Sequence, residues 1–158
     1  MAQTDSLTVP GRYDQIQYAC DFISAGARLA GFDSDTIFQL QLATDEACTN
    51  VIEHAYGAED VGSLVISWHI QAEDFVVRIR DHGRAFNPDN VPLPVIPQPP
   101  PKDNLQATAT IDTDLDDEFE IKVGGLGLYF MRTLMDDVEF RFDHDNGNTL
   151  TMTKRLPR

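Results

Sequence analysis

Three stretches of the chain carry side chains that could do chemistry, and the first lies between residues 42 and 57. Here Glu46, Asn50 and His54 follow one another at intervals of four residues. On a helix this spacing stacks the three side chains along one edge. A carboxylate can accept a proton and an amide oxygen can bind a hard cation, so Glu46 and Asn50 could act together on one polar ligand. A solvated helix edge has the same pattern, and packing or hydrogen bonding is the more common role for a histidine such as His54.

The second stretch is Asp81–Pro88, which directly follows a strand-like segment. A carboxylate at Asp81 can accept a hydrogen bond from an exocyclic amine, such as the amine of adenine. Gly83 has no Cβ, so a ligand or another part of the backbone can approach it closely. The alternative is a plain turn, because Asp-His-Gly is a common way for a chain to leave a strand. In that case Phe86 would be a simple hydrophobic plug.

The third stretch holds Gly124, Gly125 and Gly127 at the start of a helix-like segment. Exposed amides at a helix start, together with the helix dipole, favour phosphate binding. The glycines end a long loop and could let it close over a ligand, or they could form a simple hinge. Thr149 follows the turn Asn146-Gly147 and could direct its hydroxyl into the same pocket, or it could be an ordinary strand residue.

Three helices are expected to position these stretches. Apolar spacing predicts a helix over residues 14–30, stopped by Gly31. Asp33 or Ser34 then caps a long helix that ends at Gly57, a natural residue for a helix C-terminus. The apolar stripe of this long helix consists of Ile37, Leu40, Ala47, Val51 and Ala55. The third helix opens at Gly124 and carries Phe130, Met131, Leu134 and Met135.

Alternating apolar residues predict the strands. A short first strand is expected at 6–9, a hairpin at 64–70 and 75–81, and a second hairpin at 138–142 and 150–152. Because tight turns join consecutive strands, the sheet should be largely antiparallel. The three helices are expected to pack on one of its faces. The predicted fold class is therefore a two-layer α+β sandwich.

Composition limits the possible partners and the cellular setting. The formal net charge is -14, which argues against a nucleic-acid backbone or an anionic membrane and permits a basic protein partner. The chain contains no run of 18 apolar residues and no basic-then-apolar N-terminus, so we expect a cytoplasmic protein. Cys20 and Cys48 should be buried free thiols, which suits a reducing compartment.

One domain is expected to span residues 1–158, interrupted by a long mobile loop at 89–123. The loop holds eight Asp or Glu residues and two Lys, and seven of the chain's nine prolines lie at 88–101. Such a segment can neither pair in a sheet nor bury much surface. Asp112, Asp114 and Asp116 lack the glycine and glutamate of a calcium loop. The histidines do not cluster, so no metal site made only of protein side chains is expected.

Taken in order, the three stretches resemble the ATP-binding boxes of the GHKL superfamily, which includes gyrase, histidine kinases and the mismatch-repair ATPases. The matching boxes are Glu46–Asn50, Asp81–Pro88 and Gly124–Leu128. The amino-acid sequence of residues 46–56 and 124–136 is similar to that of bacterial anti-sigma factors that are serine-protein kinases. The resemblance covers roughly residues 6–155, and it implies a GHKL ATPase-like fold.

The resemblance also implies roles for individual residues. Glu46 would be the general base for the substrate hydroxyl, and Asn50 would bind the Mg²⁺ that bridges the ATP phosphates. Asp81 would accept from the adenine amine, with Gly83 beside the ring and Thr149 nearby. The remaining nucleotide-binding positions in these boxes are Phe86, Gly124, Gly125, Gly127 and Leu128, of which the last three would give backbone contacts to phosphates.

The implied activity is phosphorylation of a serine or threonine on an anti-anti-sigma protein with a STAS fold. The unphosphorylated STAS protein would compete with a sigma factor for the kinase, which in this family is commonly a homodimer. Two features depart from the family pattern: Asp45 replaces a small residue, and the loop before the third box is long and proline-rich. For the γ-phosphate, Lys122 is better placed than Lys102.

A second hypothesis assumes the same fold but no catalytic activity. The chain could be a non-catalytic nucleotide-binding module that holds a partner protein. Asp45 beside Glu46 favours the module, whereas the presence of both Glu46 and Asn50 favours the kinase. An acidic adaptor that binds no ATP would leave the three ordered boxes unexplained.

Overall fold

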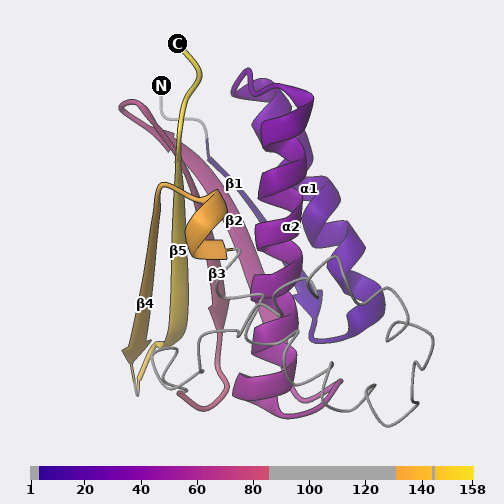
Figure 1. The fold of residues 1–158 in the computed structure, drawn as a ribbon. Coiled ribbons are helices and arrows are strands. Elements are labelled where there is room, and N and C mark those ends of the chain that lie inside the picture. The colour runs from indigo at the N-terminus through magenta and orange to yellow at the C-terminus, as the bar shows by residue number, and fades with distance from the viewer. Residues whose placement is uncertain (1–3, 86–130, 144) are drawn as a thin grey trace, which may run out of the picture.

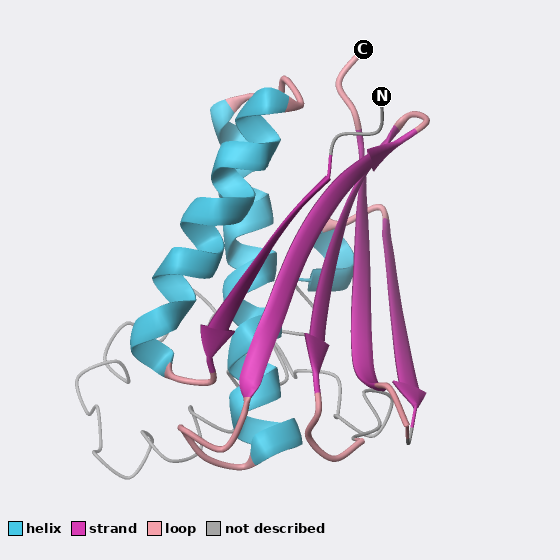
Figure 2. Cartoon of the chain, turned by 180° about the vertical axis from the view of Figure 1, so that it is seen from behind, coloured by secondary structure: helices cyan, strands magenta, loops and turns pink. Residues whose placement is uncertain are grey.

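Five antiparallel strands form one sheet, and the helices cover one of its faces (Figures 1 and 2). The computed structural model describes residues 4–85, 131–143 and 145–158. The strand order is β1-β2-β3-β5-β4. The strands are β1 Thr4–Pro10, β2 Ser63–Gln71, β3 Asp74–Asp81, β4 Asp137–Asp143 and β5 Gly147–Arg155. The helical elements are η1 Tyr13–Gln15, α1 Ile16–Leu29, α2 Ser34–Asn50 and η2 Val51–Tyr56. The predicted two-layer α+β class is confirmed.

The long second helix begins where its capping residue predicts. The Asp33 side chain accepts a hydrogen bond from the Thr36 backbone amide at 2.8 Å, which satisfies a free donor of the first turn. At the other end Gly57 is left-handed, with φ of 79°. The predicted apolar stripe is buried throughout, from Ile37 at 8% exposure to Leu40 at 0%. One feature was not predicted: the last turns, η2, form a π-helix.

The sheet follows the predicted hairpins with slightly longer strands. In the first hairpin, Ile66 pairs with Ile79 and Trp68 with Val77, so one face is apolar. The second hairpin turns at Asn146-Gly147, and Gly147 has φ of 82°, which a residue with a side chain rarely adopts. Between the two hairpins, β3 pairs antiparallel with β5. This long-range pairing brings the end of β3 beside the start of β5.

Aromatic packing joins α1 to the sheet. Trp68 stacks on Phe75 with ring centroids 5.5 Å apart, and Phe32 meets Phe75 edge-on at 5.6 Å. Gly26 of α1 lies directly over the indole, since a Cβ there would come within 2.5 Å of Trp68. The backbone of α1 therefore approaches the sheet as closely as its smallest residue permits.

The third helix is described only at its end, residues 131–134. Met131 and Met135 are buried against the core. Lys154 of β5 donates from Nζ to the Leu134 carbonyl oxygen at 2.6 Å, and this places a positive charge at the helix C-terminus. The helix start at Gly124 and the predicted loop at 89–123 lie outside the described residues.

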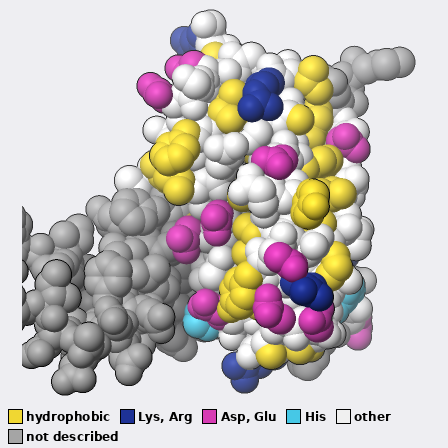
Figure 3. Space-filling view, turned by 90° about the vertical axis from the view of Figure 1, so that its right-hand side faces the viewer, with side chains coloured by type: hydrophobic (Ala, Val, Ile, Leu, Met, Phe, Trp, Pro, Cys, Tyr) yellow, Lys and Arg dark blue, Asp and Glu magenta, His cyan; other side chains and the backbone are white. Residues whose placement is uncertain are grey.

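The structure also describes the two cysteines, the length and polarity of the helices, and the surface. Cys20 and Cys48 are free and buried, as expected. No helix in the described ranges is both long and apolar enough to cross a membrane. On the face seen in Figure 3, hydrophobic side chains lie in separate groups interspersed with acidic ones.

The contact between Gly26 and Trp68 gives a stability prediction. Alanine favours a helix over glycine by about 1 kcal/mol, but overpacking a core costs about 1–3 kcal/mol. Because the Cβ would overlap the indole, we expect Gly26→Ala to lower the free energy of unfolding, measured by urea denaturation. Ala25→Gly, on the exposed side of the same turn, measures the helix contribution alone. A gain in Gly26→Ala equal to the loss in Ala25→Gly would contradict this prediction.

Candidate functional site

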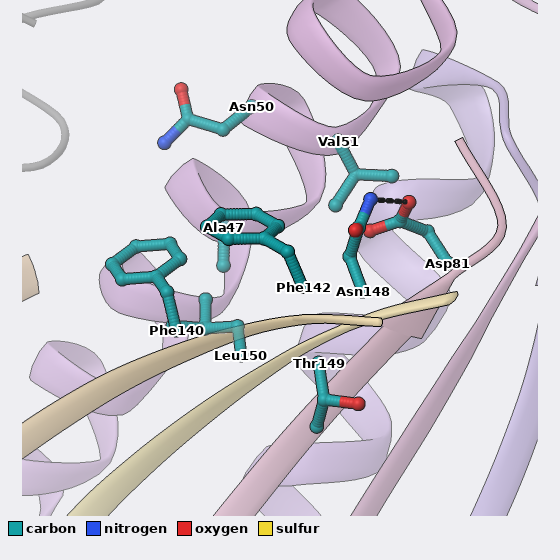
Figure 4. Close-up of a pocket in the computed structure, with 9 residues that line it drawn as sticks. All are labelled: Ala47, Asn50, Val51, Asp81, Phe140, Phe142, Asn148, Thr149 and Leu150. Carbon is teal, nitrogen blue, oxygen red and sulfur yellow. Dashed lines mark hydrogen bonds between the residues drawn. The ribbon is translucent and has the colours of Figure 1, made fainter. Parts of the chain in front are cut away.

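A pocket lies where the C-terminal half of α2 meets the ends of β3, β4 and β5 (Figure 4). Its wall is mostly apolar, and its polar side chains come from α2, β3 and β5. These elements meet because β3 and β5 are paired and α2 packs across the sheet. The lining residues are Ala47, Asn50, Val51, Asp81, Phe140, Phe142, Asn148, Thr149 and Leu150.

Asp81 is the buried carboxylate of this pocket, with only 3% of its surface exposed. Its Oδ1 accepts two hydrogen bonds, from the Gly83 amide at 2.8 Å and from Asn148 Nδ2 at 2.9 Å. Its Oδ2 has no hydrogen-bond partner among the described residues. Burial raises the pKa of Asp81, although both hydrogen bonds act to lower it. One oxygen is therefore fixed by the protein and the other remains able to accept.

Gly83 is required by a close approach of two backbone segments. A Cβ on Gly83 would come within 2.5 Å of the Ala55 carbonyl group in η2. Arg84, the next residue, donates from its amide to the Ala55 carbonyl oxygen at 2.9 Å and from Nε to the His54 carbonyl oxygen at 2.9 Å. The sequence left open whether a ligand or a backbone approaches Gly83, and in the described residues it is the backbone of η2.

Asn50 lies on the pocket wall and is buried, with 3% exposure, so the interpretation as a solvated helix edge fails for this residue. Its Nδ2 is buried without a hydrogen-bond partner in the described part of the chain. Buried amides are nearly always paired, so an unpaired one in a pocket points to a missing ligand. The implied Mg²⁺-ATP fits this test, because an asparagine side chain has an amide donor for phosphate and an oxygen for Mg²⁺. No group of three or more His, Cys, Asp or Glu in the described ranges could hold a metal.

Glu46 lies one turn before Asn50 on α2 and is half-buried. Burial raises its pKa, and the nearby negative charges of Asp45 and Glu53 raise it further. Glu46 has no hydrogen-bond partner among the described residues and is not part of the pocket wall. Its carboxylate is thus available as a proton acceptor beside the pocket rather than inside it.

Thr149 lies on β5 at the pocket and is one of its lining residues. The sequence left two interpretations open, and the ordinary strand residue agrees with its side chain, which points to the other side of the sheet (Figure 4). The cause is strand alternation, since Asn148 and Leu150 of β5 occupy the pocket side. A role for Thr149 near the nucleotide stays a prediction. Asn148, which the sequence analysis missed, holds the polar position instead. Asn148 pairs with Asp81 in the ladder between β3 and β5, and no pattern in the sequence indicates this long-range pairing.

The aromatic wall of the pocket was also missed. Phe140 and Phe142 of β4 stack with ring centroids 6.3 Å apart and face the same side as Leu150. The alternation of β4 was recognised in the sequence, but the side that it faces depends on pairing with β5. The predicted positions Phe86, Gly124, Gly125, Gly127 and Leu128, with Lys102 and Lys122, lie outside the described residues, and their roles stay predictions.

Comparison with known proteins identifies the family. Residues 9–154 match the family described as histidine kinase-like ATPase domain. The chain belongs to this family. The resemblance to the GHKL superfamily is therefore confirmed over nearly the whole chain.

Relatives narrow the assignment to serine-protein kinases of this family. The chain is 31% identical to serine-protein kinase RsbW of Halalkalibacterium halodurans, over 99% of this chain and 85% of the relative. It is 30% identical to the protein of that name in Listeria innocua, over 96% of this chain and 86% of the relative. The Bacillus cereus protein of that name is also 30% identical, over 96% and 84%. The predicted resemblance to serine-protein kinases is thus confirmed.

The raised pKa of Glu46 predicts how stability depends on pH. A carboxyl group whose pKa is higher in the folded than in the unfolded state destabilises the fold as it ionises. We therefore expect Glu46→Gln to be more stable than wild type at pH 7, in urea denaturation without ligand. The difference should shrink as the pH falls towards the ordinary glutamate pKa of 4.5, where Glu46 becomes protonated in both states.

Glu73→Gln is the matched control, because it removes one negative charge from an exposed turn between β2 and β3. It should change stability little and with weaker dependence on pH. A Glu46→Gln advantage that stayed constant from pH 4 to pH 8 would contradict the assigned burial of this carboxylate.

Proposed function

We propose that this chain is an ATP-dependent serine/threonine-protein kinase that acts as an anti-sigma regulatory factor. The observation that carries the proposal is the state of Asp81, a buried carboxylate with one oxygen fixed and the other left to accept. A free acceptor in an apolar pocket suits an exocyclic amine on a flat ring. The family match and the serine-protein kinase relatives support adenine as that ring.

The pocket walls suit a nucleobase. Val51 and Leu150 offer apolar contacts, and Phe142 offers an aromatic face to the base. Asp81 Oδ2 would accept from the adenine amine. The unpaired Asn50 amide would take up the metal and phosphate end, since it lies on the same wall. Mg²⁺-ATP would supply the phosphoryl group that is transferred.

Glu46 is the proposed general base for the substrate hydroxyl. The relevant supporting facts are its position one turn from Asn50 and its raised pKa, which makes its carboxylate a better proton acceptor. Phosphoryl transfer depends mainly on positioning and charge neutralisation, and a general base adds roughly 10²–10⁴-fold. The glycines at 124, 125 and 127, with Leu128, are proposed to contact the phosphates.

The proposed protein substrate rests on the resemblance to bacterial anti-sigma factors and not on the pocket. We propose that the phosphorylated protein is a STAS-domain anti-anti-sigma factor, and that the kinase sequesters a sigma factor until that protein displaces it. The net charge of -14 suits a basic segment of a protein partner and opposes direct nucleic-acid binding. A homodimer in the cytoplasm is the proposed assembly, with the loop at 89–123 as the lid over ATP.

Phosphoryl transfer, measured by intact mass, tests the reaction. Wild-type protein with Mg²⁺-ATP should add one phosphate to a STAS-domain protein from the same genome. Glu46→Gln should retain ATP binding and lose roughly 10²–10⁴-fold in rate, because the general base is removed. The control is Glu73→Gln, which should transfer at the wild-type rate.

Two outcomes would count against this proposal. Transfer by Glu46→Gln at the wild-type rate would remove this residue from the role of base. No phosphate on any STAS protein, while ATP still raises the thermal stability of the kinase, would favour a non-catalytic nucleotide-binding module.

Asp81→Asn tests the adenine contact separately from the reaction. Asparagine can keep its oxygen facing the Gly83 amide and Asn148, which would turn its NH₂ towards the adenine amine. Two donors would then face each other, at a cost of about 1–3 kcal/mol, or roughly ten- to hundredfold in ATP affinity. Calorimetric titration should show this loss, while the melting temperature without ligand stays at or above that of wild type. Unchanged ATP affinity would contradict the placement of adenine at Asp81.

A further inference from the structure

Asn148 of β5 has a buried side chain that forms hydrogen bonds with the end of β3 and with the residues that follow it. Its exposure is 5%, and its Nδ2 lies 2.9 Å from Asp81 Oδ1, 3.1 Å from the Gly83 carbonyl oxygen and 3.1 Å from the Arg84 carbonyl oxygen. All three contacts reach one short segment, residues 81–84. A single side chain on β5 therefore sets the position of the carboxylate and of the backbone that follows it.

The three neighbours determine which way the amide faces. Each is an acceptor, so only the NH₂ group of Asn148 can be directed towards them. Its two hydrogens serve three acceptors, which means that one hydrogen is shared. A carboxylate of the same shape at this position would place a fourth acceptor among the three. The site is thus chemically specific for a side chain with donors, and shape alone does not satisfy it.

This arrangement has a direct consequence for Asp81. Oδ1 is occupied by two donors, one from the Gly83 amide and one from Asn148, and both fix the rotation of the carboxylate. The oxygen left over is Oδ2. Without Asn148, only the Gly83 amide would hold the group. The carboxylate could then turn, and its neutral form would be favoured by burial.

We propose that Asn148 is a positioning residue that presents Asp81 as a fixed acceptor and so sets the preference for a base carrying an exocyclic amine. A base with a carbonyl group at the same position would meet an acceptor and be rejected. This inference rests on the proposed function, because it assumes that a nucleotide binds at Asp81. It adds a residue outside the three sequence boxes to the determinants of base selectivity.

The matched probes are ATP and inosine triphosphate. In inosine a carbonyl group replaces the exocyclic amine, and the adjacent ring nitrogen carries a hydrogen. The measured quantity is the ratio of their dissociation constants, by calorimetric titration. Wild type should prefer ATP by roughly tenfold or more, since a mismatched buried acceptor is costly. Asn148→Ala should reduce this ratio by most of that factor. Asn148→Thr keeps one donor and suits a strand, and should restore part of the ratio.

A pH profile separates positioning from general structural support. The hydrogen bond from Asn148 lowers the pKa of Asp81, so its loss should raise that pKa. Because the ionised carboxylate is the acceptor, ATP affinity falls as the pH drops through this pKa. In Asn148→Ala the fall should therefore begin at a higher pH than in wild type. A purely structural residue would lower affinity without moving the profile.

Thr151→Val is the matched control, because it lies on the same strand with its side chain on the opposite face and pairs with Arg78. It should keep both the wild-type ratio and the wild-type pH profile. If folded Asn148→Ala, or Asn148→Thr where the alanine variant does not fold, retains the full ATP preference, the inference is overturned. If wild type itself shows no preference for ATP, the proposed adenine site fails regardless of Asn148.

Discussion

The close approach between the end of β3 and the end of the second helix is the constraint on which the site depends. Gly83 lies against the Ala55 carbonyl group with no room for a Cβ. Arg84 then secures the contact with two hydrogen bonds to η2 carbonyl oxygens. Because η2 continues the helix that carries Glu46 and Asn50, this one contact fixes the distance between the proposed catalytic edge and Asp81. Both bonded carbonyl groups belong to the π-helical turns, a geometry that is frequent at functional sites.

Asp81 is a buried carboxylate that the described part of the fold holds by only one of its two oxygens. A buried carboxylate is costly unless its oxygens are hydrogen-bonded, and here only Oδ1 has partners in the described residues. Asn50 differs from Asp81 in that its Nδ2 is fully buried without a partner in the described residues. Both groups lie on the wall of one mostly apolar pocket. The ionised form of Glu46, beside the pocket, is destabilised by burial and by neighbouring negative charges, which raise its pKa.

Much of the fold could be predicted from local patterns. The Asp33 cap, the left-handed Gly57 and the alternation of Ile66 and Trp68 each depend on a few neighbouring residues, so the sequence was sufficient. The π-helical turns were not predicted. The partners that η2 meets, among them Arg84 and His82, are far away in the sequence. The side of the sheet that Thr149 faces was left open for a similar reason: a shift of one residue in a strand reverses every side chain.

The sequence by itself determined the fold class and the identity of Glu46, Asn50 and Asp81 as candidates, because these follow from residue types and spacing along the chain. The resemblance of its three motifs to the GHKL superfamily indicated the family. Only the tertiary structure decided which groups surround Asp81. Asn148 and Phe142 enter the pocket through the pairing of β5 with β3 and β4, and that register links residues as far apart as 81 and 148. Such contacts depend on the three-dimensional packing of the whole sheet, and no local pattern specifies them.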